Sequence, residues 1–90
     1  MYHVLIAEHH QLGGEALGGI LEGNPAVRVC QRAASTEELC RIARKTRADV
    51  VLLDLHLPPA GGLEAMRRLL TSVPKLRISC MGLKRHGPYP

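Results

Sequence analysis

Asp54 is the residue of this sequence that is best placed to do chemistry. It closes an apolar run over residues 50–53, and a stretch rich in turn-forming residues follows it. A carboxylate at the carboxyl end of a buried parallel strand lies in the crevice where open α/β sheets hold their ligands. With Glu8, His9 and His56 it would offer carboxylate and imidazole groups, which Zn²⁺, Ni²⁺ and Co²⁺ accept as ligands. The alternative is a structural carboxylate that caps the next helix or pairs with an arginine.

Short strands and helices alternate along the chain and would position these groups. Apolar runs predict strands over residues 4–7, 27–30, 49–53 and 76–81. Apolar residues at helical spacing predict helices over residues 12–21, 36–45 and 61–70. Ser35 and Glu38 form a capping box at the start of the second helix. The order βαβαβαβ implies a parallel sheet with right-handed crossovers and helices on both faces.

The first and third helices carry apolar faces that would pack on the sheet. In the first helix these residues are Leu12, Ala16, Leu17, Ile20 and Leu21. In the third helix they are Leu63, Met66, Leu69 and Leu70. The first helix also contains four glycines, Gly13, Gly14, Gly18 and Gly19. Because each interior glycine costs about 0.5–1 kcal/mol relative to alanine, we expect this helix to be the weakest.

Composition and charge are those of one small globular domain. The 90 residues are 46% hydrophobic and 22% charged, and no apolar run is long enough to span a membrane. The net charge is +4, but the basic residues fall mostly on predicted helix faces and ends. Without Trp or Phe the chain has no platform for base stacking, so direct binding to nucleic acid is not predicted. Three widely spaced cysteines and no visible signal peptide favour a soluble, cytoplasmic protein.

The spacing of Asp54, Pro58 and Gly62 resembles the phosphoacceptor region of the receiver domain of two-component response regulators. The run over residues 4–12, which includes Glu8, resembles the first strand of that family and the acidic pair after it. Two motifs in the right order are more specific than either alone. The resemblance implies a flavodoxin-like (CheY-like) parallel sheet in the order 2-1-3-4-5. That order would bring Glu8 and His9 next to Asp54.

The resemblance also implies a set of site residues. Asp54 would accept a phosphoryl group from a histidine kinase or phosphotransfer protein and would bind Mg²⁺ together with Glu8 and the backbone carbonyl of His56. His9 stands where the family has its second acid, and whether it is a ligand is left open. Since imidazole is a poor ligand for Mg²⁺, we expect weak or absent Mg²⁺ binding. A transition metal bound by Glu8, His9, Asp54 and His56 is the alternative.

Two departures from the family pattern concern its C-terminal part. Gly82 falls where receivers carry a switch Ser or Thr, and Lys84 is too close to the fourth strand to be the family's lysine. The last helix-strand-helix portion is not found, so residues 1–90 are interpreted as a single truncated, degenerate receiver domain. An uncovered fourth strand would invite self-association, and we expect a homodimer with residues 76–83 at or near the contact.

The function predicted from these residues is that of a non-enzymatic response-regulator receiver module in a phosphorelay. The stretch over residues 62–65 and the first helix look most like transcription regulators that carry a C-terminal helix-turn-helix. Asp54 would be a weakly phosphorylated phosphoprotein site, and the domain would act mainly through protein contacts. The first alternative is a constitutive, non-phosphorylated interaction or dimerisation module. A metal-dependent hydrolase using Glu8, His9 and Asp54 is the least favoured, because the chain has no evident oxyanion hole.

Overall fold

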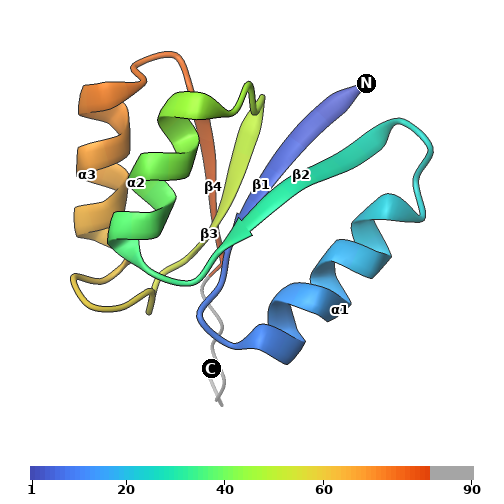
Figure 1. Ribbon diagram of the computed structural model, residues 1–90, viewed down its shortest axis with the longest axis horizontal. Coiled ribbons are helices and arrows are strands. Elements are labelled where there is room, and N and C mark those ends of the chain that lie inside the picture. Colours follow the sequence, from blue (N-terminus) through green and yellow to red (C-terminus); the bar gives the residue numbers. More distant parts are fainter. Residues whose placement is uncertain (82–90) are drawn as a thin grey trace, which may run out of the picture.

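Strands and helices alternate along the chain in the predicted order βαβαβαβ (Figure 1). The structure is a computed structural model and describes residues 1–81. Its elements are β1 (Tyr2–Ala7), α1 (Gln11–Glu22), β2 (Val27–Ala33), α2 (Thr36–Lys45), β3 (Val50–Asp54), α3 (Gly62–Ser72) and β4 (Arg77–Met81). Gly82 and Lys84, which were assigned as departures from the family pattern, lie outside the described residues.

The four strands form one parallel sheet in the order β2-β1-β3-β4. Ala7 at the end of β1 pairs with Leu53, so the chain leaves β1 and β3 at the same level and at the same edge of the sheet. The pairing of β1 with β2 contains an irregularity. Val4 pairs with Val29 but Leu5 pairs with Gln31, which leaves Cys30 as one extra residue on β2.

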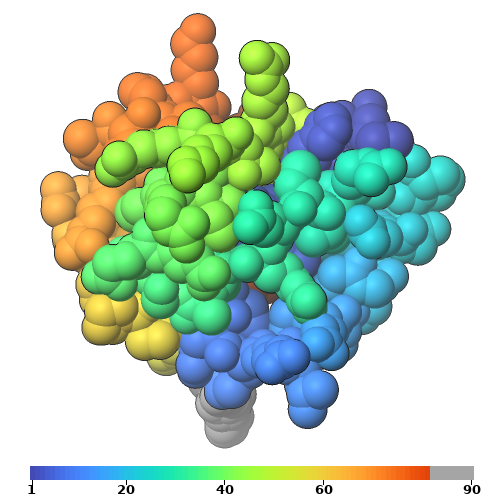
Figure 2. Space-filling view, in the orientation of Figure 1, coloured from blue at the N-terminus to red at the C-terminus, as the bar shows by residue number. Residues whose placement is uncertain are grey.

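The main core lies between the sheet and the pair of helices α2 and α3. Leu5, Val51 and Leu53 point to this side, where they pack with Leu39 and Leu69 in one buried cluster. Because successive side chains of a strand point to opposite faces, the even-numbered residues of β1 point to the other face, which α1 covers. Figure 1 shows α2 and α3 together on one side of the sheet and α1 alone, and in Figure 2 α2 and β2 make up much of the near surface.

The apolar face predicted for α3 is right at Leu69 and Met66, which lie in or against the core, and wrong at Leu63 and Leu70. Leu63 is 70% exposed and Leu70 is 42% exposed, whereas Ala65 and Leu69 are fully buried. The buried stripe begins at Gly62, whose backbone lies against the loop that follows β3. Since neighbouring residues of a helix differ by about 100° in direction, placing Gly62 against the protein turns Leu63 toward solvent.

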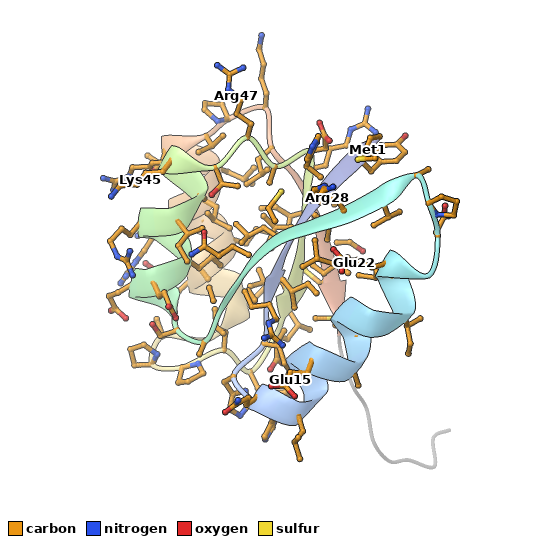
Figure 3. The ribbon with its side chains drawn as sticks, turned by 45° about the vertical axis from the view of Figure 1, so that its right-hand side comes forward. Met1, Glu15, Glu22, Arg28, Lys45 and Arg47 are labelled. Carbon is orange, nitrogen blue, oxygen red and sulfur yellow. The ribbon has the colours of Figure 1, made fainter. Side chains whose placement is uncertain are left out.

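The apolar face predicted for α1 is only partly used. Leu12 and Ile20 are 79% and 75% exposed, and Gly14 is the one buried residue of the helix. At its C-terminal end α1 is tied to the sheet, because Glu22 Oε2 accepts a hydrogen bond of 2.8 Å from the backbone N–H of Val29 (Figure 3). At its N-terminal end Gly13 and Gly14 lie close to Glu8, so α1 approaches the sheet there while two of its large apolar side chains face solvent.

The start of α2 is capped as predicted. Ser35 Oγ accepts a hydrogen bond of 3.2 Å from the backbone N–H of Glu38. Glu38 in turn accepts from the backbone N–H of Ala34 at 2.8 Å, one residue before the expected position. The backbone N–H of Thr36 donates to the carbonyl of Pro58 at 2.8 Å, so the first turn of α2 also holds the loop after β3.

Candidate functional site

The candidate site lies where β1 and β3 end side by side. Glu8 and His9 follow the last residue of β1, and Asp54 is the last residue of β3. His9 Nδ1 lies 2.9 Å from Asp54 Oδ2. The predicted meeting of the two strand ends is therefore confirmed at the level of side-chain contact.

Asp54 is a buried carboxylate with both oxygens engaged. The residue is 4% exposed, its Oδ1 accepts a hydrogen bond of 2.9 Å from the backbone N–H of His56, and its Oδ2 faces His9. Burial by itself raises the pKa of Asp54, but the hydrogen bonds from His56 and His9 outweigh it and hold the pKa below its usual value. An ionised carboxylate only accepts hydrogen bonds, so His9 Nδ1 carries the proton in this contact.

Glu8 forms a second pair with the histidine that follows His9. Its Oε2 accepts from His10 twice, from the backbone N–H at 3.1 Å and from ring Nδ1 at 3.0 Å. The rings of His9 and His10 lie close together, with centroids 3.8 Å apart. One ligand atom from each of Glu8, His9, His10 and Asp54 can be chosen so that all four lie within 4.8 Å of one another. We call these four residues the His/carboxylate cluster.

The cluster differs from the predicted transition-metal set by one histidine. Glu8, His9 and Asp54 come together as expected, but the imidazole of His56 is not in the group and that residue is exposed. His56 acts on Asp54 through its backbone N–H, and its carbonyl as a metal ligand stays a prediction. His10 was missed by sequence reasoning, because its contact with Glu8 depends on the turn of the chain after β1 and not on residue spacing alone.

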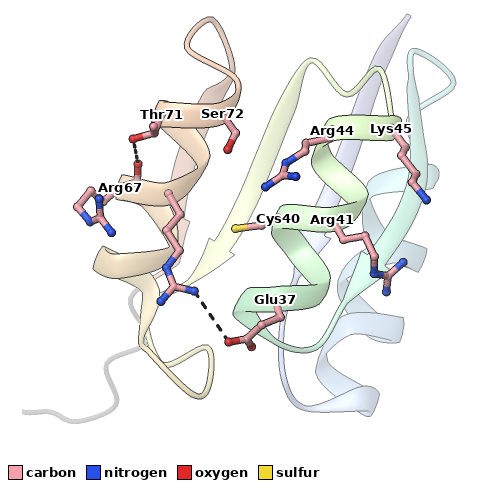
Figure 4. Close-up of a pocket in the computed structure, with 9 residues that line it drawn as sticks. Glu37, Cys40, Arg41, Arg44, Lys45, Arg67, Thr71 and Ser72 are labelled. Atoms are coloured by element: carbon pink, nitrogen blue, oxygen red, sulfur yellow. Dashed lines mark hydrogen bonds and ion pairs between the residues drawn. The ribbon is translucent and has the colours of Figure 1, made fainter.

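A hollow of about 640 Å³ lies between α2 and α3, apart from the His/carboxylate cluster (Figure 4). Its lining is largely cationic and comprises Glu37, Cys40, Arg41, Arg44, Lys45, Arg67, Arg68, Thr71 and Ser72. Two of these arginines, Arg67 and Arg68, are held by Glu64, at 2.5 Å and 3.0 Å, and lower the pKa of Glu64 to about 2. The hollow contains neither Asp54 nor any member of the His/carboxylate cluster.

Among the described residues, the basic side chains on and just after α2 lie where the sequence analysis expected them, on a helix face and a helix end. Lys45 ends α2 and Arg47 follows it, and both side chains extend into solvent (Figure 3). Arg41 and Arg44 are likewise exposed on α2. Among the described residues, no helix is long and apolar enough to cross a membrane.

Comparison with known proteins places the sequence in a family. It matches the response regulator receiver domain family over residues 4–89. It is similar to response regulator GacA of Pseudomonas viridiflava, with 34% identity over 90 residues that make up 100% of this chain and 42% of that protein. It is 31% identical over 90 residues to response regulator UvrY of Escherichia coli K12, of which it covers 41%. The chain thus spans well under half the length of these relatives.

Comparison with solved structures agrees with the sequence match. The crystal structure of a two-component response regulator of the LuxR family, from Aurantimonas sp. SI85-9A1, superposes with a TM-score of 0.83 at 31% identity. The match covers 87% of this chain and 56% of that one. The flavodoxin-like, CheY-like fold predicted from the sequence is confirmed.

Proposed function

This chain belongs to the response regulator receiver domain family of two-component signalling, and from that premise we propose that Asp54 is its phosphoryl acceptor and that it accepts the group weakly. Receiver domains interact with histidine kinases or phosphotransfer proteins, and we propose a partner of that kind here. The observation that carries the proposal is the position of Asp54, a carboxylate with a lowered pKa at the carboxyl end of a central strand, whose Oδ2 faces His9.

The transfer is a displacement at phosphorus. An oxygen of Asp54 attacks the phosphorus of a phosphohistidine, the new O–P bond forms as the P–N bond breaks, and the departing imidazole nitrogen takes up a proton from solvent. Oδ1 is held by the backbone N–H of His56, so Oδ2 is the oxygen free to attack once His9 turns away. The contact with His9 therefore competes with the reaction, and this supports slow phosphorylation.

The ligand set at this site also argues for slow transfer. Receiver domains generally bind Mg²⁺ in an acidic pocket, where the ion neutralises charge between a carboxylate and the incoming phosphoryl oxygens. In this chain two of the four clustered ligand atoms are imidazole nitrogens, and His9 occupies Oδ2 of Asp54. Mg²⁺ prefers a shell of oxygen atoms, so the donors present do not fit it.

The finer part of the proposal is that the domain acts through protein contacts, as a homodimer in the cytoplasm. Sheet strand β4 has a strand neighbour on one side only among the described residues, which supports pairing with a second copy at β4. Residues 82 and 83 of the predicted contact lie outside the described residues. By similarity to GacA and UvrY, which are named response regulators, we also propose a role in the regulation of transcription as part of a longer protein.

The experiment that tests the acceptor is intact-mass measurement after incubation with Mg²⁺ and a small-molecule phosphodonor. We expect one phosphoryl adduct on the wild-type chain in low yield and none on Asp54→Asn. Asp49→Asn is the matched control, because Asp49 is an exposed carboxylate next to the start of the same strand and should not change the yield. An adduct of equal yield on Asp54→Asn, or none on folded wild type, would favour a constitutive interaction module instead.

A further inference from the structure

The His/carboxylate cluster combines two carboxylates with two imidazoles. Its two close pairs are His9 Nδ1 with Asp54 Oδ2 at 2.9 Å and His10 Nδ1 with Glu8 Oε2 at 3.0 Å. We propose that this cluster is a binding site for a divalent transition metal of the Zn²⁺ class. Its ligands would be two imidazole nitrogens and two carboxylate oxygens, and the ion would replace the proton that each Nδ1 donates in these pairs, with the protons released to solvent.

The distances suit a tetrahedral ion. Zn²⁺ binds nitrogen and carboxylate oxygen at about 2.0–2.2 Å, so two ligand atoms of one tetrahedral ion lie roughly 3.3 Å apart. Both close pairs are within a few tenths of an ångström of that separation. One ligand atom of each of the four residues can be chosen so that no separation exceeds 4.8 Å, which requires a closure of about 1.5 Å at most, and the exposed His10 and the half-buried His9 can supply it by side-chain rotation.

The surroundings hold two of the four ligands in place. Asp54 keeps Oδ1 on the backbone N–H of His56, which leaves Oδ2 turned toward the imidazoles. Glu8 is fixed by the backbone N–H of His10 and lies directly against α1, where a Cβ built on Gly13 would stand 3.4 Å from its carboxyl carbon. Such outer contacts orient ligands and typically change metal affinity by about 10–100-fold when removed.

The metal can reach the cluster from solvent. A hollow of about 600 Å³ is lined by Glu8, His9 and His10. The side chain of His10 is 71% exposed and that of His9 is 29% exposed, while that of Asp54 is 6% exposed. The ion would therefore have His9 and His10 on its solvent side and Asp54 on its protein side. This arrangement would allow the ion to bind and leave reversibly.

A metal at this position would control the acceptor. This consequence, unlike the binding itself, depends on the proposed function. An ion bound to Oδ2 of Asp54 would occupy the oxygen that attacks phosphorus, so metal loading and phosphorylation would exclude each other. The domain would then respond to two inputs, a phosphodonor and the availability of a transition metal.

The test measures metal binding by the full 90-residue chain after treatment with a chelator. Co²⁺ is added and the visible absorption spectrum is recorded, followed by displacement with Zn²⁺. We expect one equivalent of Co²⁺ with the intense bands of tetrahedral N/O coordination and without thiolate charge-transfer bands, which separates this site from the cysteines. His9→Ala and His10→Ala should each weaken the affinity by about tenfold or more, in line with the loss of a ligand.

His3→Ala is the matched control, because it removes an imidazole that faces Asp49 and lies outside the cluster. It should bind Co²⁺ within about twofold of wild type. Octahedral spectra only, or unchanged binding by the His9→Ala, His10→Ala double variant, would overturn the proposal. Because no phosphodonor is present, failure of the acceptor and failure of the metal site give different results.

Discussion

Gly62 rests on the backbone of Leu55 with no room for a side chain. A Cβ built on Gly62 would lie 2.5 Å from Leu55 Cα and 2.9 Å from the carbonyl oxygen of Asp54. The backbone N–H of Gly62 donates to the carbonyl of Leu55 at 2.8 Å, and the preceding Gly61 has a φ of 89°, which favours glycine. The glycine eight residues after Asp54 is thus explained by a close approach of α3 to the loop that carries Asp54.

Replacing Gly62 with alanine should destabilise the fold. The added methyl group must push α3 away from a backbone that cannot yield as a flexible side chain would. Overpacking of this kind costs about 1–3 kcal/mol, and the gain in helix propensity offsets only part of it. We expect a lower urea midpoint, measured by circular dichroism. An unchanged midpoint would show that α3 moves without cost.

Replacing Gly19 with alanine should have the opposite sign. A Cβ on Gly19 would meet no atom within 4 Å, so the substitution adds helix propensity without a clash. We expect α1 to gain about 0.5–1 kcal/mol, visible as a rise in the same urea midpoint. Because the change is again glycine to alanine, Gly19→Ala also controls for Gly62→Ala. A loss of stability would mean that α1 packs differently from the structure.

The Asp54 carboxylate should make the fold sensitive to acid. Its pKa is lower in the folded protein than in the unfolded chain, so its contribution to the free energy of unfolding is complete above the unfolded pKa, about 3.8. That contribution is lost as the pH falls through the folded pKa. Wild type should therefore lose stability more steeply than Asp54→Asn below about pH 4. Urea unfolding at several pH values checks this, and parallel curves would contradict the shift.

Replacing His9 with aspartate should shift the metal preference of the site from a transition metal toward Mg²⁺. His9→Asp removes one imidazole and adds a carboxylate oxygen beside Glu8 and Asp54, a set that suits Mg²⁺ better. A metal ion can supply several kcal/mol of charge stabilisation, so we expect the initial rate of phosphorylation with Mg²⁺ to rise about tenfold or more. The rate of adduct formation is followed by intact mass. His56→Ala, measured beside it, should leave the rate near that of wild type.

A homodimer through β4 should be sensitive to charge on that strand. Lysine on an edge strand opposes pairing with another strand. Ser79→Lys, at an exposed position of β4, should therefore shift the mass measured by light scattering at high micromolar concentration from dimer toward monomer. Gln31→Lys places the same charge at an exposed position of the other edge strand, β2, and should leave the dimer intact. A wild-type monomer at that concentration would contradict the proposed homodimer.

The strand order, the helices and the meeting of Glu8 and His9 with Asp54 were predictable from the sequence. Continuous apolar runs predicted the parallel strands, and the resemblance to the receiver family gave the strand order that the sheet shows, with β1 beside β3. The boundaries differ by a few residues at most. For example, β2 extends to Ala33 and not 30, because β1 offers it pairing partners along that length.

The direction of the helices and one site residue were less predictable. Four leucine and methionine positions on α3 suggested an inward face, but the close approach of Gly62 to Leu55 sets the rotation, and this is a backbone contact with no apolar signal. His10 joins Glu8 through a turn of the chain immediately after β1, a geometry that residue spacing alone does not specify. The rotation of α3 and the place of His10 therefore depend on a close backbone contact and a local turn, which the pattern of apolar residues does not encode.

The extra residue at Cys30 makes the two edges of the sheet unequal. Along β2 the spacing of backbone groups is broken at this bulge, whereas the pairing of β3 with β4 is in register throughout. Within residues 1–81, the regular pairing of β3 with β4 leaves β4 as the edge without a bulge for a strand from another copy. A head-to-tail array would pair β4 of one copy with β2 of the next and would need both edges of the sheet. Copies joined through β4 alone instead pair β4 of one copy with β4 of the other. Such an arrangement closes at two subunits by a two-fold axis and does not grow into a fibre.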